Sequence, residues 1–392
     1  MAYKDQVITG TDGPETLYGY GGDDALYGLK GDDELRGGTG DDRLFGNDGM
    51  DQLHGGPGDD RLLGGAGDDQ LIGGDGNDRY WLDADNRDRV EERAGGGIDE
   101  VVTDHYYFTL DQHSLSQVEN LTTVSNRKCL LYGNALDNVI SSGRGEDVLF
   151  GDYGDDILKA GMGDDQLYGG PGDDRLLGGL GWDQMYGGTG DDVYSVIDDR
   201  ESVNEEFGEG YDSVFAVVDY QLRPNVEKLT LGGAATAGYG NHGDNLLIGH
   251  DGGVRLRGAN GNDELRGGAD DDDLGGGLGI DRATGGGGGD AFKYLAGDAG
   301  ASRRNADAIL DFSQADGDSI ALDGIDAVST SAGNDRFTFI GSGAFSGAAG
   351  ELHARVVNGN TFVEADTDGD KVADLVIRLS GEIVLTASDF VL

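Results

Sequence analysis

The sequence predicts an all-β protein made of three parallel β-roll blocks, joined by β-rich inserts and followed by a C-terminal β-sandwich-like domain. Three observations predict this fold: a nine-residue repeat, glycine and aspartate at fixed places within it, and a bulky apolar residue at its eighth position. The consensus is G-G-x-G-x-D-x-U-x, where U is the apolar residue. The segment GGPGDDRLLGG occurs letter for letter at 55–65 and at 169–179. We therefore interpret the nonapeptide as a building unit and not as a catalytic site.

The repeats form three unbroken runs, and each run ends where the composition changes. Eight units run from Gly10 to Trp81, seven from Gly133 to Ser195 and six from Gly240 to Lys293. The two segments between the runs resemble each other and alternate apolar with polar residues, which is typical of β-strands. We expect each insert to cap one roll and start the next. The predicted boundaries are 1–81, 82–132, 133–195, 196–239, 240–293 and 294–392.

Each unit reads as a turn followed by a short strand. Glycines in the first six positions allow left-handed backbone and let carbonyl groups crowd around one point. In the last three positions, alternation sends U inward and its neighbours outward. Two units make one coil, so units n and n+2 stack, and the sixth-position aspartates form columns.

Stacked carboxylates one strand spacing apart repel each other unless a cation lies between them. Ca²⁺ suits such a site, because it accepts six to eight oxygen ligands in loose geometry. Mg²⁺ is too demanding geometrically, and Zn²⁺ prefers His or Cys, which the turns lack. With one ion per stacked pair, the blocks would hold roughly 6, 5 and 4 ions. The predicted ligands are Asp24, Asp33, Asp42, Asp51, Asp60, Asp69, Asp78, Asp147, Asp156, Asp165, Asp174, Asp183, Asp192, Asp263, Asp272, Asp281 and Asp290.

The charge of the chain limits its partners. There are 76 acidic residues against 28 basic ones, a net charge of -48. This charge repels nucleic acid and anionic lipid, so we expect no nucleic-acid partner and no membrane insertion. Cys129 is the only cysteine, which excludes an internal disulfide framework. The composition lies near the disordered class, so calcium binding would supply the free energy of folding.

The third block departs most from the consensus. Val254 stands in the ligand position, Asp270 replaces a glycine, and the small residue Ala283 stands at the eighth, core position. We expect this block to be the weakest roll, with a missing or poor site at the Val254–Asp272 pair.

The repeats resemble the calcium-binding nonapeptides of RTX proteins. The tail, from NADAILDFSQADGDSIALDGID (305–326) to the chain end, resembles the C-terminal region of serralysin-type metalloproteases and related RTX exoproteins. That resemblance implies an uncleaved type I secretion signal, ending here in Asp389, Phe390, Val391 and Leu392. It also implies a type I exporter as partner, and a secreted, extracellular or cell-surface location in a Gram-negative bacterium. The start, MAYKDQVITG, lacks the regions of a cleavable signal peptide.

No sequence pattern for catalysis is found. The serralysin zinc motif HExxH, a G-x-S-x-G elbow and a P-loop are all absent from the sequence, and the repeats begin at Gly10, so we expect no enzyme activity. We expect a secreted protein that folds on extracellular calcium and serves a structural, surface-layer or matrix, or adhesion role. The alternative is a stand-alone polysaccharide-binding or accessory module of an exoenzyme. Self-assembly and an acidic polysaccharide are the partners considered. DTDGDKVAD (366–374) hints at a further calcium loop, but it lacks the final Glu of an EF-hand, so we favour an exposed turn.

Aromatic and apolar residues recur at the ninth position of alternate units. The first block has Tyr27, Phe45, Leu63 and Trp81, with Arg43, Arg61 and Arg79 beside them, and the second has Phe150, Tyr168 and Tyr186. We expect these strips to be contact surfaces between rolls, within one chain or between chains. Cover by the inserts or the tail is the other possibility.

Overall fold

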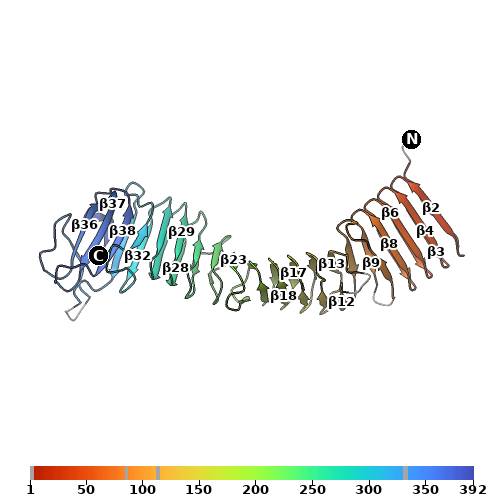
Figure 1. Ribbon diagram of the computed structural model, residues 1–392, viewed down its shortest axis with the longest axis horizontal. Helices are drawn as coiled ribbons and strands as arrows, with labels where there is room; N and C mark the ends of the chain where they lie inside the picture. The colour runs from red at the N-terminus through yellow and green to blue at the C-terminus, as the bar shows by residue number, and fades with distance from the viewer. Residues whose placement is uncertain (1–3, 84–86, 112–114, 330–333) are drawn as a thin grey trace. The chain divides into compact units, whose positions relative to one another are not determined.

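The computed structural model describes residues 4–83, 87–111, 115–329 and 334–392. The chain is an all-β parallel solenoid (Figure 1) that divides into two compact units. The first unit comprises Met1–Ser195 and Arg200–Asn204, and the second comprises Val196–Asp199 and Glu205–Leu392. Within the described residues, no helix combines the length and the apolar character needed to cross a membrane.

The first unit contains one long parallel sheet and two shorter parallel sheets, and the chain alternates between the long sheet and a shorter one. The long sheet pairs β1 (Val7–Thr9), β3 (Ala25–Lys30), β5 (Arg43–Asp48), β7 (Arg61–Ala66), β9 (Arg79–Leu82), β11 (Glu100–Thr103), β13 (Asn120–Thr123), β15 (Val139–Ser141), β17 (Ile157–Met162), β19 (Arg175–Leu180) and β21 (Val193–Val196). One shorter sheet contains β2 (Thr16–Gly21), β4 (Glu34–Thr39), β6 (Gln52–Pro57), β8 (Gln70–Asp75) and β10 (Arg89–Glu91). The other contains β12 (Tyr107–Thr109), β14 (Leu130–Tyr132), β16 (Val148–Phe150), β18 (Gln166–Pro171), β20 (Gln184–Thr189) and β22 (Ser202–Asn204).

The register of these sheets confirms the predicted roll. Leu26 pairs with Leu44, and Leu44 with Leu62, each 18 residues on. All three side chains are fully buried, so the eighth positions form a continuous apolar column between the sheets. Burying a leucine side chain stabilises the fold by roughly 1.5–3 kcal/mol, and here the gain recurs at every coil.

The insert after the first block continues the coil and does not only cap it. Val101 of β11 pairs with Tyr80 on one side and with Leu121 of β13 on the other, and Leu121 pairs with Ile140 of the second block. The insert therefore supplies the same inward apolar residue from longer coils.

The tight turns between strands require glycine. Gly56 and Gly58 have φ of 118° and 140°, in the left-handed region that favours glycine. A Cβ on either residue would overlap a backbone carbonyl of the preceding coil. Glycine is thus needed for both the turn and the close stacking of coils.

The second unit is built in the same way. One ladder contains β23 (Ser213–Ala216), β25 (Lys228–Leu231), β27 (Leu246–Ile248), β29 (Glu264–Gly268), β31 (Arg282–Gly286), β33 (Asp307–Ile309) and β38 (Leu375–Ser380). The facing sheet contains β24 (Tyr220–Gln221), β26 (Ala237–Tyr239), β28 (Arg255–Asn260), β30 (Asp273–Leu278), β32 (Ala291–Leu295), β34 (Ser319–Gly324) and β39 (Phe390–Val391), which follows the short 3-10 helix η1 (Ala387–Asp389).

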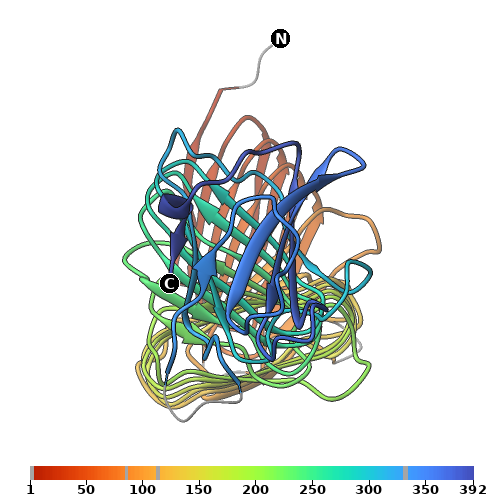
Figure 2. The ribbon, with the colours of Figure 1, turned by 90° about the vertical axis from the view of Figure 1, so that its left-hand side faces the viewer.

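The tail extends these two sheets, and the predicted separate β-sandwich is not confirmed. After β35 (Thr338–Phe339), strands β36 (Glu351–Val357), β37 (Asn360–Asp366) and β38 run antiparallel (Figure 2). Because β38 also pairs in parallel with β33, the antiparallel strands continue the ladder that the repeats began.

One ion-pair cluster fastens the tail together. Glu364 on β37 accepts bonds from Arg303 at 2.7 Å, Arg355 at 2.6 Å and His353 at 2.7 Å. Burial raises the pKa of Glu364, but these three donors more than offset the burial and hold the pKa at about 2.

Candidate metal centres

Backbone hydrogen bonds place the predicted aspartates in columns along the coils. The backbone N–H of Asp24 donates to Oδ1 of Asp42 at 2.7 Å, and that of Asp42 donates to Asp60 at 2.8 Å. The alternate units form a second column, in which Asp33 donates to Asp51 at 2.7 Å. Each step spans 18 residues, as two units per coil require.

The predicted ligands share this environment throughout the three blocks. All seventeen are at most 3% exposed. The same bond joins Asp51–Asp69, Asp60–Asp78, Asp147–Asp165, Asp165–Asp183, Asp156–Asp174, Asp174–Asp192, Asp263–Asp281 and Asp272–Asp290. The structure therefore brings the seventeen side chains into buried columns, one set in each block.

The second carboxylate oxygen, Oδ2, is buried without a hydrogen-bond partner in most of these aspartates. They are Asp24, Asp33, Asp42, Asp51, Asp60, Asp69, Asp78, Asp147, Asp156, Asp165, Asp174, Asp263, Asp272, Asp281 and Asp290. Burying a charged oxygen without a partner costs free energy of folding, so each of these atoms favours a cation beside it.

The surroundings of Oδ2 fit an oxygen-binding cation. At Gly151, a Cβ would overlap both Oδ2 of Asp156 and the backbone carbonyl of Gly169. The same arrangement recurs at Gly258, with Asp263 and the Gly276 carbonyl. Carboxylate and carbonyl oxygens thus converge beside a Cα that carries no side chain, and this donor set suits Ca²⁺.

The pKa values of the column aspartates also favour a bound cation. Burial raises the pKa of Asp60 to about 7 and that of Asp78 and Asp156 to about 8. The backbone bond from the preceding coil lowers these pKa values, but neighbouring carboxylates raise them further. The columns can be fully ionised at neutral pH only when positive charge lies between the carboxylates.

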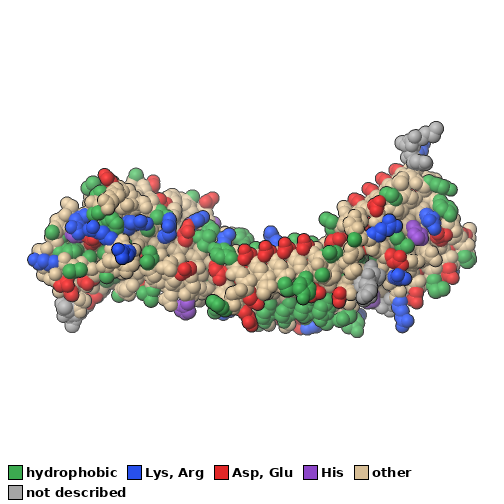
Figure 3. Space-filling view, in the orientation of Figure 1, with side chains coloured by type: hydrophobic (Ala, Val, Ile, Leu, Met, Phe, Trp, Pro, Cys, Tyr) green, Lys and Arg blue, Asp and Glu red, His purple; other side chains and the backbone are tan. Residues whose placement is uncertain are grey.

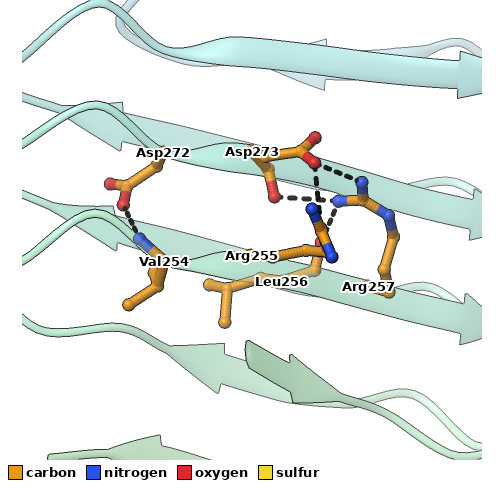
Figure 4. A network of polar contacts seen from close by, with 6 residues as sticks. All are labelled: Val254, Arg255, Leu256, Arg257, Asp272 and Asp273. Atoms are coloured by element: carbon orange, nitrogen blue, oxygen red, sulfur yellow. Dashed lines mark hydrogen bonds and ion pairs between the residues drawn. The ribbon is translucent and has the colours of Figure 1, made fainter. Parts of the chain in front are cut away.

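The column is interrupted at Val254, as Figure 4 shows. Its backbone N–H still donates to Oδ1 of Asp272 at 2.8 Å, but a valine methyl occupies the place of Oδ2 beside Gly249. The coil register is therefore preserved while one carboxylate is lost, at the pair for which the sequence predicts a missing or poor site.

Two arginines pair with a carboxylate outside the column, next to this interruption. Arg255 and Arg257 flank Leu256 on β28 and contact Oδ2 of Asp273 at 3.1 and 2.7 Å (Figure 4). Burial raises the pKa of Asp273, but the two guanidinium groups outweigh it and hold the pKa below its usual value.

The columns also extend beyond the repeats, which the sequence analysis missed. Asp69 donates to Asp88 at 3.0 Å and Asp78 to Asp99 at 2.8 Å, while Asp281 and Asp290 each donate at 3.0 Å to a tail residue. A signal for them exists in the sequence, because each begins a D-x-apolar tripeptide like the D-x-U of the nonapeptide. The four additional aspartates are Asp88, Asp99, Asp307 and Asp318.

A further acidic group lies in the tail loop at 366–374. Asp366, Asp368 and Asp374 each place one carboxylate oxygen within 4.8 Å of the others. Asp366 accepts bonds from two backbone N–H groups of the loop, and Asp374 accepts bonds from Thr367. These carboxylates thus shape the turn, and the interpretation of the segment as an exposed turn stays a prediction.

Comparison with known proteins identifies the repeats. The family model of the RTX calcium-binding nonapeptide repeat matches residues 9–44, 27–62, 45–80, 132–167, 160–194, 239–274 and 255–283. The chain carries RTX calcium-binding nonapeptide repeats. RTX repeats bind calcium and are typical of secreted proteins.

Among solved structures, the chain is similar to the AlgE6R3 subunit of the Azotobacter vinelandii mannuronan C5-epimerase. The match has 24% sequence identity and a TM-score of 0.26, and it covers 43% of this chain and 81% of that one. Comparison with curated proteins gives no match.

Proposed function

We propose that this RTX-repeat protein is a secreted structural or adhesion protein whose fold depends on extracellular calcium. The observation that carries the proposal is the pair of buried aspartate columns, in which Oδ2 atoms lie close to turn carbonyls. In the fifteen aspartates named above, Oδ2 has no hydrogen-bond partner among the described residues. Here the seventeen aspartates of the three blocks are the calcium ligands, and Asp88, Asp99, Asp307 and Asp318 extend the set. Calcium binding then supplies the free energy of folding.

Circular dichroism during a calcium titration tests this proposal. The chain should be unfolded in excess EGTA and become β-rich cooperatively, in the micromolar-to-millimolar range of sensors and extracellular modules. A β-rich spectrum that persists in EGTA would overturn it.

Export through a type I exporter is the second part of the proposal. It rests on the tail resemblance, since the segment Asp389–Leu392 ends in an acidic residue followed by apolar ones. In the folded chain, Phe390 pairs with Ile320 of β34, and Asp389 accepts a bond from Gln314 at 2.7 Å. Deleting 389–392 should abolish secretion and leave calcium-induced folding of the rolls intact, as measured by immunoblotting of medium and cells. Secretion of the truncated chain by the same exporter would contradict this assignment.

Self-association is the assembly that we propose for the structural role. Tyr27 and Phe45 stack at 4.8 Å with an interplanar angle of 4° on the long sheet, and Arg79 lies 4.8 Å above the Trp81 ring. These ninth-position side chains are only half-buried in the described structure. Sedimentation of the calcium-loaded chain should show association that weakens in the double variant Phe45→Ser with Leu63→Ser, at unchanged calcium stoichiometry. Equal association of the double variant and the parent would exclude this face.

Polysaccharide binding is a second candidate, favoured by an aromatic ladder on the sheet opposite the first strip. Tyr132, Phe150, Tyr168 and Tyr186 stack at 4.6–4.8 Å with interplanar angles of 4–8°. Figure 3 shows a hydrophobic band over the region of β12 to β18. A groove of about 550 Å³ runs beside the ladder, lined also by Asp111 and Asp152.

The chemistry of this groove favours an uncharged, hydroxyl-rich chain. None of the described residues that line it is Lys, Arg or His, and the carboxylates of Asp111 and Asp152 would repel an acidic polymer. Affinity electrophoresis in gels containing neutral glucans, with Phe150→Ala as the variant and Phe45→Ala as the control, tests this role. Equal retardation of the parent and Phe150→Ala would exclude the groove.

A further inference from the structure

Three carboxylates from separate segments meet where the first repeat block ends. Asp78 precedes β9, Glu92 follows β10 and Asp99 precedes β11. One carboxylate oxygen from each lies within 4.8 Å of the other two. Among the described residues, none of these three carboxylates takes part in an ion pair with a basic side chain.

This group differs from the repeat turns in its ligand chemistry. Within the repeats, backbone carbonyls of glycine lie beside Oδ2, whereas here the side chain of Glu92 enters from the insert. Asp78 is 1% exposed, and its Oδ2 has no hydrogen-bond partner among the described residues. This Oδ2 lies beside the Tyr80 hydroxyl, which bonds Glu92. A buried, unpartnered carboxylate oxygen close to two other carboxylates is suited to binding a cation.

Tyr80 orients this arrangement. It takes the place of leucine in the buried apolar column and is fully buried. Because tyrosine is longer than leucine, its hydroxyl reaches the turn beside Gly73. The hydroxyl donates to Oε1 of Glu92, and the backbone N–H of Arg93 donates to Oε2 at 3.0 Å. The Tyr80 hydroxyl and Asp78 Oδ2 lie together against the Cα of Gly73. Glu92 is therefore held toward the other two carboxylates.

We propose that Asp78, Glu92 and Asp99 together bind one Ca²⁺ through side chains from three segments, and that this ion locks the insert onto the first repeat block. The inference rests on the calcium-dependent fold proposed above. Three carboxylates give this site more negative charge than a repeat turn with two, and higher ligand charge tightens calcium binding. In the sequence, a tyrosine also ends the core column of the second block, at Tyr194, and Glu205 and Asp212 follow it.

Counting bound ions on the full chain tests the site. Native mass spectrometry and equilibrium dialysis with calcium should show one ion fewer in Glu92→Gln than in the parent, or that ion bound at least tenfold more weakly. Glu91→Gln is the matched control, because Glu91 carries the same charge one residue away and pairs outward with Arg89 and Gln70. Hydrogen exchange of Glu100–Thr103 should rise in Glu92→Gln alone.

Each outcome supports the inference or overturns it. An unchanged ion count and affinity in Glu92→Gln overturns the junction site, while a parent chain that binds no calcium overturns the proposed function itself. If Glu91→Gln loses the same bound ion, the junction site is also overturned, because the loss would then follow from the change in net charge. If Glu92→Gln does not fold in calcium, Tyr80→Phe replaces it, since the ring still fills the core. Binding of one ion should then weaken several-fold, and unchanged binding overturns the inference.

Discussion

The first and third repeat blocks share one coil geometry but differ in how completely they use it. In the first block the two columns run without a break, and the core positions from Leu26 to Leu71 are fully buried leucines. In the third block Val254 interrupts a column, and Ala283 is only half-buried. The backbone bond from Val254 to Asp272 survives nonetheless. Register is therefore set by backbone and glycine geometry, whereas the capacity to bind cations is set residue by residue.

The largest expected difference between the blocks is their response to pH in calcium-free buffer. Burial raises the pKa of all seven column aspartates of the first block and of all four of the third, to about 8 in Asp78 and about 7 in Asp263, so more groups change charge in the first block. A raised pKa in the folded state means that the contribution to stability is present below the unfolded pKa of about 3.9 and is lost as pH rises through the folded value. Without calcium, β structure should therefore increase from pH 8 to pH 5, and the first block should respond more steeply.

Hydrogen exchange resolved by block, at pH 5 and pH 8, measures this. In calcium the trend should reverse, because protons compete with the ions for the same oxygens. A calcium-free chain that is equally unprotected at both pH values would contradict the prediction.

Replacing a core leucine should break the regular block. Leu62→Ala removes a fully buried side chain between Leu44 and Tyr80, and such changes cost about 2–5 kcal/mol. Chemical denaturation in saturating calcium should show this loss. The converse change, Ala283→Leu, should be far milder because that site is half-buried. A loss as large as that of Leu62→Ala would show that the third core is already close-packed.

Removing one carboxylate charge should weaken the first block by less. Asp60→Asn keeps the Oδ1 acceptor for Asp42 but replaces the unpartnered Oδ2 with a donor group that repels calcium. The calcium midpoint should rise several-fold, and the ion count should fall by one or two. Asp59→Asn is the control, since Asp59 is exposed. An equal shift in both variants would assign the effect to net charge.

Restoring the missing carboxylate should give the smallest effect, in the opposite direction. Val254→Asp continues the column and should add about one ion, with a gain of about 1 kcal/mol in saturating calcium. Calorimetric titration against the parent measures it. A loss of stability without an added ion would mean that Arg255 and Arg257 already provide what the third block needs.

The sequence predicts the repeating parts well, because each unit carries its own structural information. The spacing of aspartate and leucine is enough to place all seventeen side chains in columns and to mark Val254 as the interruption. It was less informative where coils lengthen: Asp88 and Asp99 continue the columns after gaps of 19 and 21 residues, which a fixed period does not detect. The tail was harder still, since its antiparallel strands join the ladder through β38, a contact that no local pattern encodes.

The sequence also does not predict on which sheet each aromatic strip lies. In the sequence, the strip of Tyr27 and the ladder of Phe150 have the same pattern, but in the structure they lie on opposite sheets. Tyr27 and Phe45 lie on β3 and β5 of the long sheet, while Phe150 and Tyr168 lie on β16 and β18 of the facing one. The irregular length of the insert changes which units face which way, and composition does not reveal that change.

The two identical copies of GGPGDDRLLGG lie on the same sheet, through β7 and β19. Recombination between their coding sequences would therefore remove or duplicate whole coils and return every later strand to its original face. A gain or loss of a single nonapeptide would instead move each later strand to the opposite sheet and exchange the two outer surfaces. A change in length by an even number of units would therefore leave the outward surfaces unaltered, whereas an odd step would exchange them.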